Sequence, residues 1–265
     1  MASVLQWQHP WQQGFSFSGN HRVDAARFAA LTPEQRTRIG WFDYHSPFRT
    51  GIPEIDHSAT LFTILREPVA RVVSFMHHVW DGKSPGLSEF SGGDRFPVTA
   101  FLRDPIPELQ NLQTKMMLNT SSCTSPEELK RLGHDAALEL ATEHLLEGMA
   151  AFGLQEELDA SLLLMQQPLG WRTPLYVSRN RRSSVGQISL TPAQRRRIEG
   201  LNSLDMRLYA QARTHFDQRK RRAGITSDAV ARFARQRRAT APVVQTTALA
   251  RRGVTRLQNR TGGRI

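Results

Sequence analysis

The sequence is short of cysteine and of long apolar runs. Cys123 is the single cysteine, so no disulfide can form within the chain, which fits a reducing compartment. No segment approaches the roughly 20 consecutive apolar residues of a membrane-spanning helix. The first residues, MASVLQWQHPWQQG, have neither the basic nor the apolar region of a signal peptide. We therefore expect a soluble, cytoplasmic protein, and its 39% of hydrophobic residues suffice for a packed core.

Acidic residues are nearly absent from the end of the chain. Residues 219–265 hold 13 Arg and Lys and one acid, Asp228, and so carry +12, whereas residues 1–218 carry −1 of the net +11. Phe233 is the only aromatic residue in this tail. The composition predicts a folded domain over 1–218 and a basic, disordered tail over 219–265. The tail is either a solvated extension or an arm that contacts polyanions.

Helix starts are marked by a hydroxyl residue followed by proline. Such a pair places an N-cap before a proline at the first helical position, and it occurs at Thr32-Pro33, Ser125-Pro126 and Thr191-Pro192. The helix that begins at the third pair continues to about residue 217, because apolar residues recur there at steps of three or four. Similar patterns predict helices over 69–79, 107–118, 135–149 and 155–167.

Strand signals alternate with these helices. The clearest is ATLFTIL at 59–65, which is short, apolar and partly β-branched, and weaker candidates lie at 40–44 and 150–154. Alternation of strands and helices predicts a three-layer α/β fold with a parallel sheet. Ligands of such folds bind in the loops at the carboxyl ends of the strands.

The segment TLFTILREPVARVVSFMHH, residues 60–78, joins the clearest strand to a helix. The strand ends in Arg66, and Ser74 follows eight residues later on the helix. A phosphate bound there would receive a guanidinium fork and a hydroxyl. On spacing alone, an arginine that ends a strand and a serine packed in a helix explain the pattern more simply.

LREPVARVVSF resembles the 3′-phosphate-binding segment of carbohydrate-type sulfotransferases of the heparan-sulfate-sulfotransferase kind, whose pattern is L-R-[DE]-P-V-x-R-x-x-S. Four further segments resemble motifs of that family in the same order. They are 111–115 (N-L-Q-T-R), 152–162 (F-G-L-T-E-R-F-D-E-S-L), 169–180 (L-G-W…P-x-Y…N) and 198–209 (I-x-x-x-N-x-x-D-x-x-L-Y). The resemblance covers about residues 1–217. It implies a P-loop-NTPase-like parallel sheet with flanking helices.

The resemblance also implies a co-substrate, 3′-phosphoadenosine 5′-phosphosulfate (PAPS). It assigns Arg66 and Ser74 to the 3′-phosphate, and it places Arg179 and Asn180 in a loop that approaches the nucleotide. Arg71, in the same motif, is interpreted as structural, anchoring its helix to a carboxylate.

His45 is the candidate catalytic base. YHSPF at 44–48 resembles the family's G-H-x-x-F segment, although Tyr44 replaces the glycine, and that histidine removes the proton of the acceptor hydroxyl in some members. A hydrogen-bonded histidine at a strand end is an equally good interpretation. His77 and His78 are adjacent and diverge on a helix, so we assign no metal.

One motif of the family is missing. Its members hold the 5′-phosphosulfate in a glycine-rich turn resembling P-K-T-[GA]-G-T-[ST] after a first strand. This sequence has no such turn and no lysine before residue 40, and residues 2–10 resemble the helix that follows the turn. We expect the first strand and P-loop to be absent from this chain, either because the start codon is placed too late or because the chain is a truncated, inactive relative.

These observations predict a sulfotransferase that moves a sulfuryl group from PAPS to a hydroxyl of a carbohydrate or related acceptor, impaired in the chain as written. The alternatives are a non-catalytic sulfotransferase-like binding module and a polyanion-binding protein acting through the tail. We expect no stable nucleic-acid partner. A P-loop kinase would need a GK[ST] loop and a magnesium carboxylate, and the sequence shows neither.

Overall fold

The computed structural model describes residues 2–9, 13–17, 21–43, 50–118, 129, 131–176 and 187–260. The strands are β1 (Gln13–Ser16), β2 (Ile39–Asp43), β3 (Phe62–Leu65) and β4 (Ala151–Leu154). The helices are α1 (Ala2–Gln8), α2 (His21–Ala29), α3 (Pro33–Thr37), α4 (Pro53–Ser58), α5 (Pro68–Trp80), α6 (Val98–Phe101), α7 (Leu112–Met117), α9 (His134–Glu143), α10 (Leu158–Gln166), α11 (Pro192–Leu201), α12 (Ser203–Arg222) and α13 (Ser227–Arg260). Short helical turns are η1 (Pro85–Phe90), η2 (Pro107–Leu109), η3 (His144–Gly148) and η4 (Gln155–Glu157).

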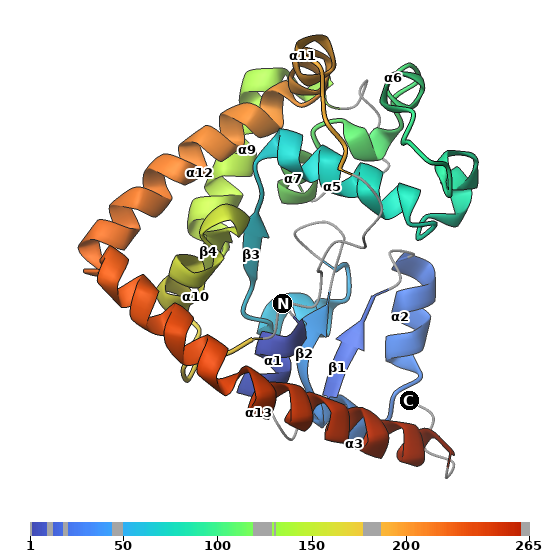
Figure 1. Cartoon of the computed structure of the whole chain (residues 1–265). Helices are drawn as coiled ribbons and strands as arrows, with labels where there is room; N and C mark the ends of the chain where they lie inside the picture. The colour runs from blue at the N-terminus through green and yellow to red at the C-terminus, as the bar shows by residue number, and fades with distance from the viewer. Residues whose placement is uncertain are drawn as a thin grey trace.

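The four strands form two parallel pairs, β1 with β2 and β3 with β4. In the second pair Leu65 lies opposite Leu154, so both strands end at the same level. Helices lie between the strands in sequence and around them in space (Figure 1). The prediction of an α/β fold with parallel strands is therefore confirmed.

The strands predicted at 40–44, 59–65 and 150–154 correspond to β2, β3 and β4. β1 was missed, because its sequence QGFS contains one large apolar residue, Phe15, and no β-branched residue. Gly14 permits the close approach of β2 here, since a side chain at this position would collide with the ring of Trp41.

Two of the three predicted helix starts are confirmed. Thr32 and Thr191 each form a capping box with the glutamine three residues later. The Ser125-Pro126 start lies outside the described residues. The long helix predicted from residue 191 is interrupted at Asn202, where α11 ends and α12 begins.

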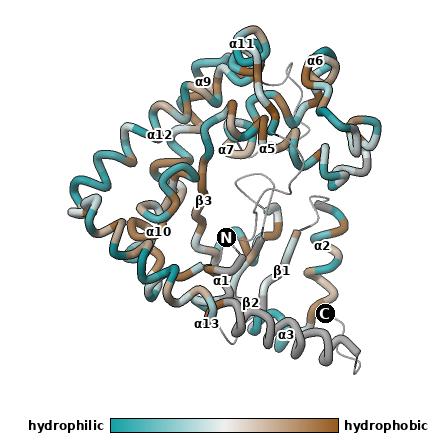
Figure 2. Tube along the Cα trace, in the orientation of Figure 1, coloured by the Kyte–Doolittle hydropathy of each residue, from teal (hydrophilic) through white to brown (hydrophobic). Residues whose placement is uncertain are grey.

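The core around β3 and β4 is covered by α7, α9, α10 and α12 (Figure 1). α5 buries one apolar face, which includes Val72, Met76 and Val79. Figure 2 shows β3 as an apolar strand, whereas α12 is largely hydrophilic on the side in view. Over the described ranges, no helix combines the length and apolarity needed to cross a bilayer.

The end of the chain differs from the prediction of a disordered tail. The predicted boundary at residue 218 falls inside α12, and residues 227–260 form α13, which passes beside α1 (Figure 1). Phe233 and Val244 of α13 are buried in a cluster with Val4 and Trp171. The two residues are eleven positions apart, close to three full helical turns, so they lie on one face. The composition of the tail did not predict the burial of these two residues, because most other residues of the tail are small or charged.

Candidate functional site

The candidate site is centred on Arg66, where the chain leaves β3. Leu65 before it is buried, and α5 begins two residues later with Pro68 at its first position. Glu67 caps this helix, because its carboxylate accepts hydrogen bonds from the backbone N–H groups of Val69 (3.1 Å) and Ala70 (2.6 Å). The free amides at the start of α5 are therefore already satisfied by a side chain of the same turn.

The backbone of Arg66 is held by Gln113 of α7. The Arg66 N–H donates to Oε1 of Gln113 at 2.8 Å, and Nε2 of Gln113 donates to the Arg66 carbonyl at 2.9 Å. The next peptide N–H, that of Glu67, donates to Oε1 of Glu156 at 3.0 Å, and the Tyr209 hydroxyl donates to Oε2 of the same carboxylate at 2.8 Å. Side chains distant in sequence thus hold the end of the strand.

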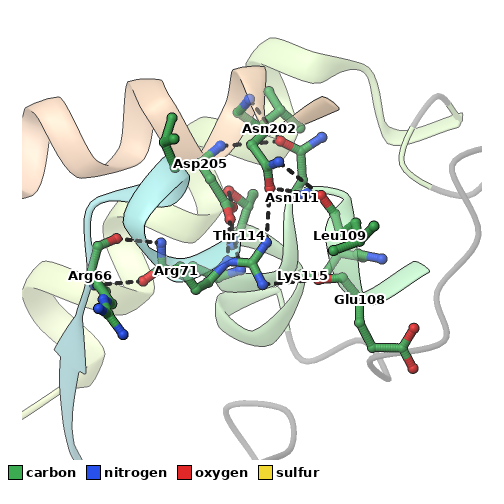
Figure 3. Close-up of polar contacts among 12 residues, drawn as sticks. Arg66, Arg71, Glu108, Leu109, Asn111, Thr114, Lys115, Asn202 and Asp205 are labelled. Atoms are coloured by element: carbon green, nitrogen blue, oxygen red, sulfur yellow. Dashed lines mark hydrogen bonds and ion pairs between the residues drawn. The ribbon is translucent and has the colours of Figure 1, made fainter. Parts of the chain in front are cut away.

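The side chain of Arg66 is different. It is half-buried, and its guanidinium makes no hydrogen bond or ion pair with any residue that the structure describes. Figure 3 shows it pointing away from the polar contacts around Arg71. A cation in this state at the carboxyl end of a parallel strand is suited to bind an anion.

Arg71 has a structural role, as the sequence predicted. Its guanidinium donates to the Glu108 carbonyl at 2.9 Å and to Oδ1 of Asn202 at 3.0 Å, and its Nε lies 4.0 Å from Oδ2 of Asp205 (Figure 3). Burial lowers the pKa of Arg71, and the neighbouring charge of Arg66 adds to that, whereas the charge of Asp205 raises it. The prediction that Arg71 anchors α5 to a carboxylate is confirmed.

Asp205 is the centre of this buried network. It is 0% exposed and accepts hydrogen bonds from the N–H groups of Gln113 (3.1 Å) and Thr114 (2.8 Å) and from the Thr114 hydroxyl (2.7 Å). The carboxylate therefore joins α12 to the first turn of α7 and, through Arg71, to α5.

Two asparagines complete the network and explain the break between α11 and α12. Oδ1 of Asn111, a residue with φ of 47°, accepts from the N–H groups of Leu204 (2.9 Å) and Asp205 (3.2 Å) at the start of α12. Asn202 receives Arg71 and the Asn111 N–H at Oδ1, and its Nδ2 donates to two backbone carbonyls. Asn111 thus accepts the first N–H groups of α12, and Asn202 stands at the break itself.

The remaining predicted site residues are placed as follows. Ser74 lies on α5, half-buried, and among the described residues its hydroxyl has no side-chain partner. His45, Arg179 and Asn180 lie outside the described residues, so their roles stay predictions. In the part of the chain that is described, no group of three or more His, Cys, Asp and Glu is arranged to hold a metal ion.

Sequence analysis missed the residues that position Arg66. Gln113, Glu156, Tyr209 and Asp205 all stand in or beside segments that resemble family motifs, but no role was assigned to them. Their motif positions were the available signal. Their partners lie between 47 and 92 residues away along the chain, which the local pattern does not reveal.

A second polar cluster joins α13 to the segment 169–176. The Tyr176 hydroxyl donates to Asp159 at 3.0 Å, Nε of Arg237 lies 3.1 Å from the same carboxylate oxygen, and the Arg237 guanidinium lies 4.4 Å from the Tyr176 ring centre. Burial, followed by the charge of Asp159, raises the pKa of Tyr176 to about 12. Nearby, Nε1 of Trp7 donates to the Thr173 carbonyl at 3.0 Å, so α1 packs against the same segment.

A surface hollow lies between the end of α10 and the turn joining α12 to α13. Gln166, Trp171 and Gly224 are among its lining residues, and neither Arg66 nor Ser74 lines it. Since α10 starts near the end of β4 and runs back along it, this hollow lies away from the carboxyl ends of the strands. It is not part of the candidate site.

Comparison with known proteins gives concordant matches. The sequence model of the galactose-3-O-sulfotransferase family matches residues 46–260. Human heparan-sulfate 6-O-sulfotransferase 2 is 28% identical over 177 residues, which are 59% of this chain and 29% of the human protein. Heparan-sulfate 6-O-sulfotransferase 3-B of Danio rerio is 29% identical over 177 residues, 59% of this chain and 42% of that protein. The chain spans less than half the length of these relatives.

Proposed function

Because the chain belongs to the galactose-3-O-sulfotransferase family, a family of carbohydrate sulfotransferases, we propose that it transfers a sulfuryl group from PAPS to a hydroxyl of a carbohydrate or related acceptor. The observation that supports this proposal is the state of Arg66. Its backbone is held by Gln113 at the end of β3, while its guanidinium has no partner among the described residues.

In this proposal Arg66 and Ser74 bind the 3′-phosphate of the nucleotide. The amides at the start of α5 are occupied by the Glu67 cap, so they leave little for an anion. Recognition of the phosphate therefore depends on side chains, and a guanidinium can give it two parallel hydrogen bonds. Arg179 and Asn180 are proposed as further nucleotide contacts.

The proposed chemistry needs alignment and one proton acceptor. The acceptor oxygen forms a bond to sulfur while the bond between sulfur and the bridging phosphate oxygen breaks, and adenosine 3′,5′-bisphosphate (PAP) leaves with that electron pair. His45 is proposed to take the proton of the attacking hydroxyl. β2 ends at Asp43, two residues before His45 in sequence.

The acceptor is proposed only as a carbohydrate hydroxyl. The matching family is named for position 3 of galactose, whereas the matching relatives are named for position 6 of heparan sulfate. The names agree on a sugar hydroxyl and disagree on the sugar and the position, so they support the class alone.

We further propose that the strands and helices form a three-layer, P-loop-like arrangement.

We also propose that the two ends of the nucleotide are bound by different segments. The 3′-phosphate is bound by residues present here, but the sequence contains no P-K-T-G-G-T-like turn for the 5′-phosphosulfate. These 265 residues are thus expected to bind PAP while transferring sulfate slowly. The rate of sulfate transfer measured with radiolabelled PAPS tests this, and fast turnover by the 265 residues would contradict it.

Calorimetric titration with PAP and with adenosine 5′-phosphate (AMP), which lacks the 3′-phosphate, tests the proposed function. We expect PAP to bind at least about tenfold more tightly than AMP, because a charge-assisted bidentate contact contributes roughly 1.5–3 kcal/mol. Arg66→Ala should remove most of that preference and leave AMP affinity unchanged. Arg103→Ala, which removes an exposed arginine, is the matched control. Equal affinities for PAP and AMP in the unmodified chain would overturn the proposal.

A further inference from the structure

Gln113 contacts both backbone polar groups of a single residue. Its amide accepts from the Arg66 N–H at 2.8 Å and donates to the Arg66 carbonyl at 2.9 Å. An antiparallel strand offers one residue the same pair of contacts, and Arg66 directly follows Leu65, the last residue of β3 that pairs with β4. The Gln113 side chain thus satisfies both backbone polar groups of the residue at which β3 ends.

Gln113 is itself held firmly. It is 8% exposed, and its own N–H donates to Asp205, which is 0% exposed. Asp205 is in turn engaged by Thr114 and lies beside Arg71. The backbone from which the Gln113 side chain extends is therefore held by a buried polar network.

The backbone and the side chain of Arg66 differ in their contacts. Its backbone contacts are complete, and the following N–H of Glu67 is held by Glu156. Its guanidinium makes no hydrogen bond or ion pair with the described part of the chain and points away from the contacts around Arg71 (Figure 3). Fixing the backbone restricts the directions that the side chain can take, which lowers the entropy lost when an anion binds.

We propose that Gln113 is a positioning residue for the nucleotide 3′-phosphate, acting through the Arg66 backbone. This inference rests on the proposed function. Without the Gln113 amide, the turn at Arg66 populates other conformations, and the apparent affinity for the 3′-phosphate falls by the fraction of chains that keep the competent one.

Gln113→Glu is the sharpest variant, because it preserves the shape of the side chain. The carboxylate still accepts from the Arg66 N–H but cannot donate to the Arg66 carbonyl, whereas a protonated carboxyl restores that donor. Gln110→Glu is the matched control, since the Gln110 amide bonds to the Pro105 carbonyl and not to Arg66. Gln113→Asn, which keeps the amide but shortens its reach, is the second variant.

The readouts are the ratio of AMP to PAP dissociation constants, the thermal unfolding midpoint, and hydrogen exchange of the Arg66 amide without ligand. At pH 7 we expect Gln113→Glu to lower the ratio about tenfold and to speed exchange at Arg66, whereas Gln110→Glu changes neither. As pH falls from about 7 to about 5, the ratio should recover relative to the unmodified chain at the same pH. In an Arg66→Ala background, Gln113→Glu should have no further effect on the ratio.

Equal losses of PAP and AMP affinity, or an unchanged ratio with a lowered unfolding midpoint, would overturn the positioning role and leave Gln113 a structural residue. An unchanged rate of exchange at Arg66 in both Gln113 variants would overturn it without any ligand. Failure of the proposed function looks different, because the unmodified chain would then show no preference for PAP over AMP.

Discussion

Both parallel strand pairs pack against apolar side chains, but the contacts that distinguish them are different. At the carboxyl end of β3 there is also a buried polar network built on Asp205 and Gln113. The pair β1–β2 is packed by aromatic rings, with Phe15 at 5.8 Å from Phe28 and 6.2 Å from Phe42 between ring centres. Hydrogen bonds require particular angles between donor and acceptor, whereas apolar packing mainly requires side chains of matching volume. The orientation of the backbone at Arg66 is therefore fixed by hydrogen bonds.

Asp205→Ala should lower the free energy of unfolding more than the other substitutions proposed for the two strand pairs. It removes the carboxylate beside Arg71 and leaves the N–H groups of Gln113 and Thr114 without their acceptor, and breaking such a buried pair costs roughly 3–5 kcal/mol. Urea unfolding measures the free energy. Asp217→Ala, at a partly exposed ion pair with Arg213, is the control and should cost under about 1 kcal/mol. Similar losses for the two variants would contradict the special status of the network.

Phe15→Ala is the corresponding change on the aromatic side. Phe15 is 6% exposed and contacts rings from α2 and β2, so its truncation should cost roughly 3 kcal/mol. Because no polar contact to Arg66 is lost, the preference for PAP over AMP should stay unchanged in the fraction that is folded. A change in that preference would show that the two strand pairs are coupled at the site.

A glycine in each strand pair offers a finer comparison. A Cβ at Gly153 would lie 2.5 Å from Cβ of Ser161, which is fixed to the backbone of α10, whereas at Gly14 it would meet the ring of Trp41, which can rotate away. Gly153→Ala should therefore cost about 2 kcal/mol and Gly14→Ala about 1 kcal/mol, measured by urea unfolding. The reverse order would mean that the Trp41 ring is held more rigidly than the Ser161 backbone.

Tyr176 tests the second polar cluster, and it comes last because its ionisation changes the stability only at alkaline pH, above about 10. The pKa of Tyr176 is raised to about 12, chiefly by burial and then by Asp159, so folding favours the protonated phenol. Its contribution to stability is complete below the ordinary tyrosine pKa of about 10 and is lost as pH rises toward 12. Ultraviolet titration of the tyrosinate, with Tyr176→Phe as the reference, measures the midpoint. A midpoint near 10 would contradict the buried contact with Asp159.

Several elements could be read from neighbouring residues alone. The strand–turn–helix around Arg66 is encoded by an apolar run, a glutamate cap and a proline within a few positions. The capping boxes at Thr32 and Thr191 are equally local. The carboxylate anchor of Arg71 was also predicted, from a family motif. Such signals act over one or two helical turns, so the sequence displays them directly.

Other features depended on packing between distant segments. Gln113 reaches Arg66 from 47 residues away, and Asp205 reaches Gln113 from 92. β1 is too short and too polar to be recognised without β2 beside it. α13 looked disordered by composition, but Phe233 and Val244 contact a surface that exists only once α1 and α10 are in place. Local propensity could place Arg66 at the end of a strand, whereas long-range hydrogen bonds and burial set the direction in which its backbone is held.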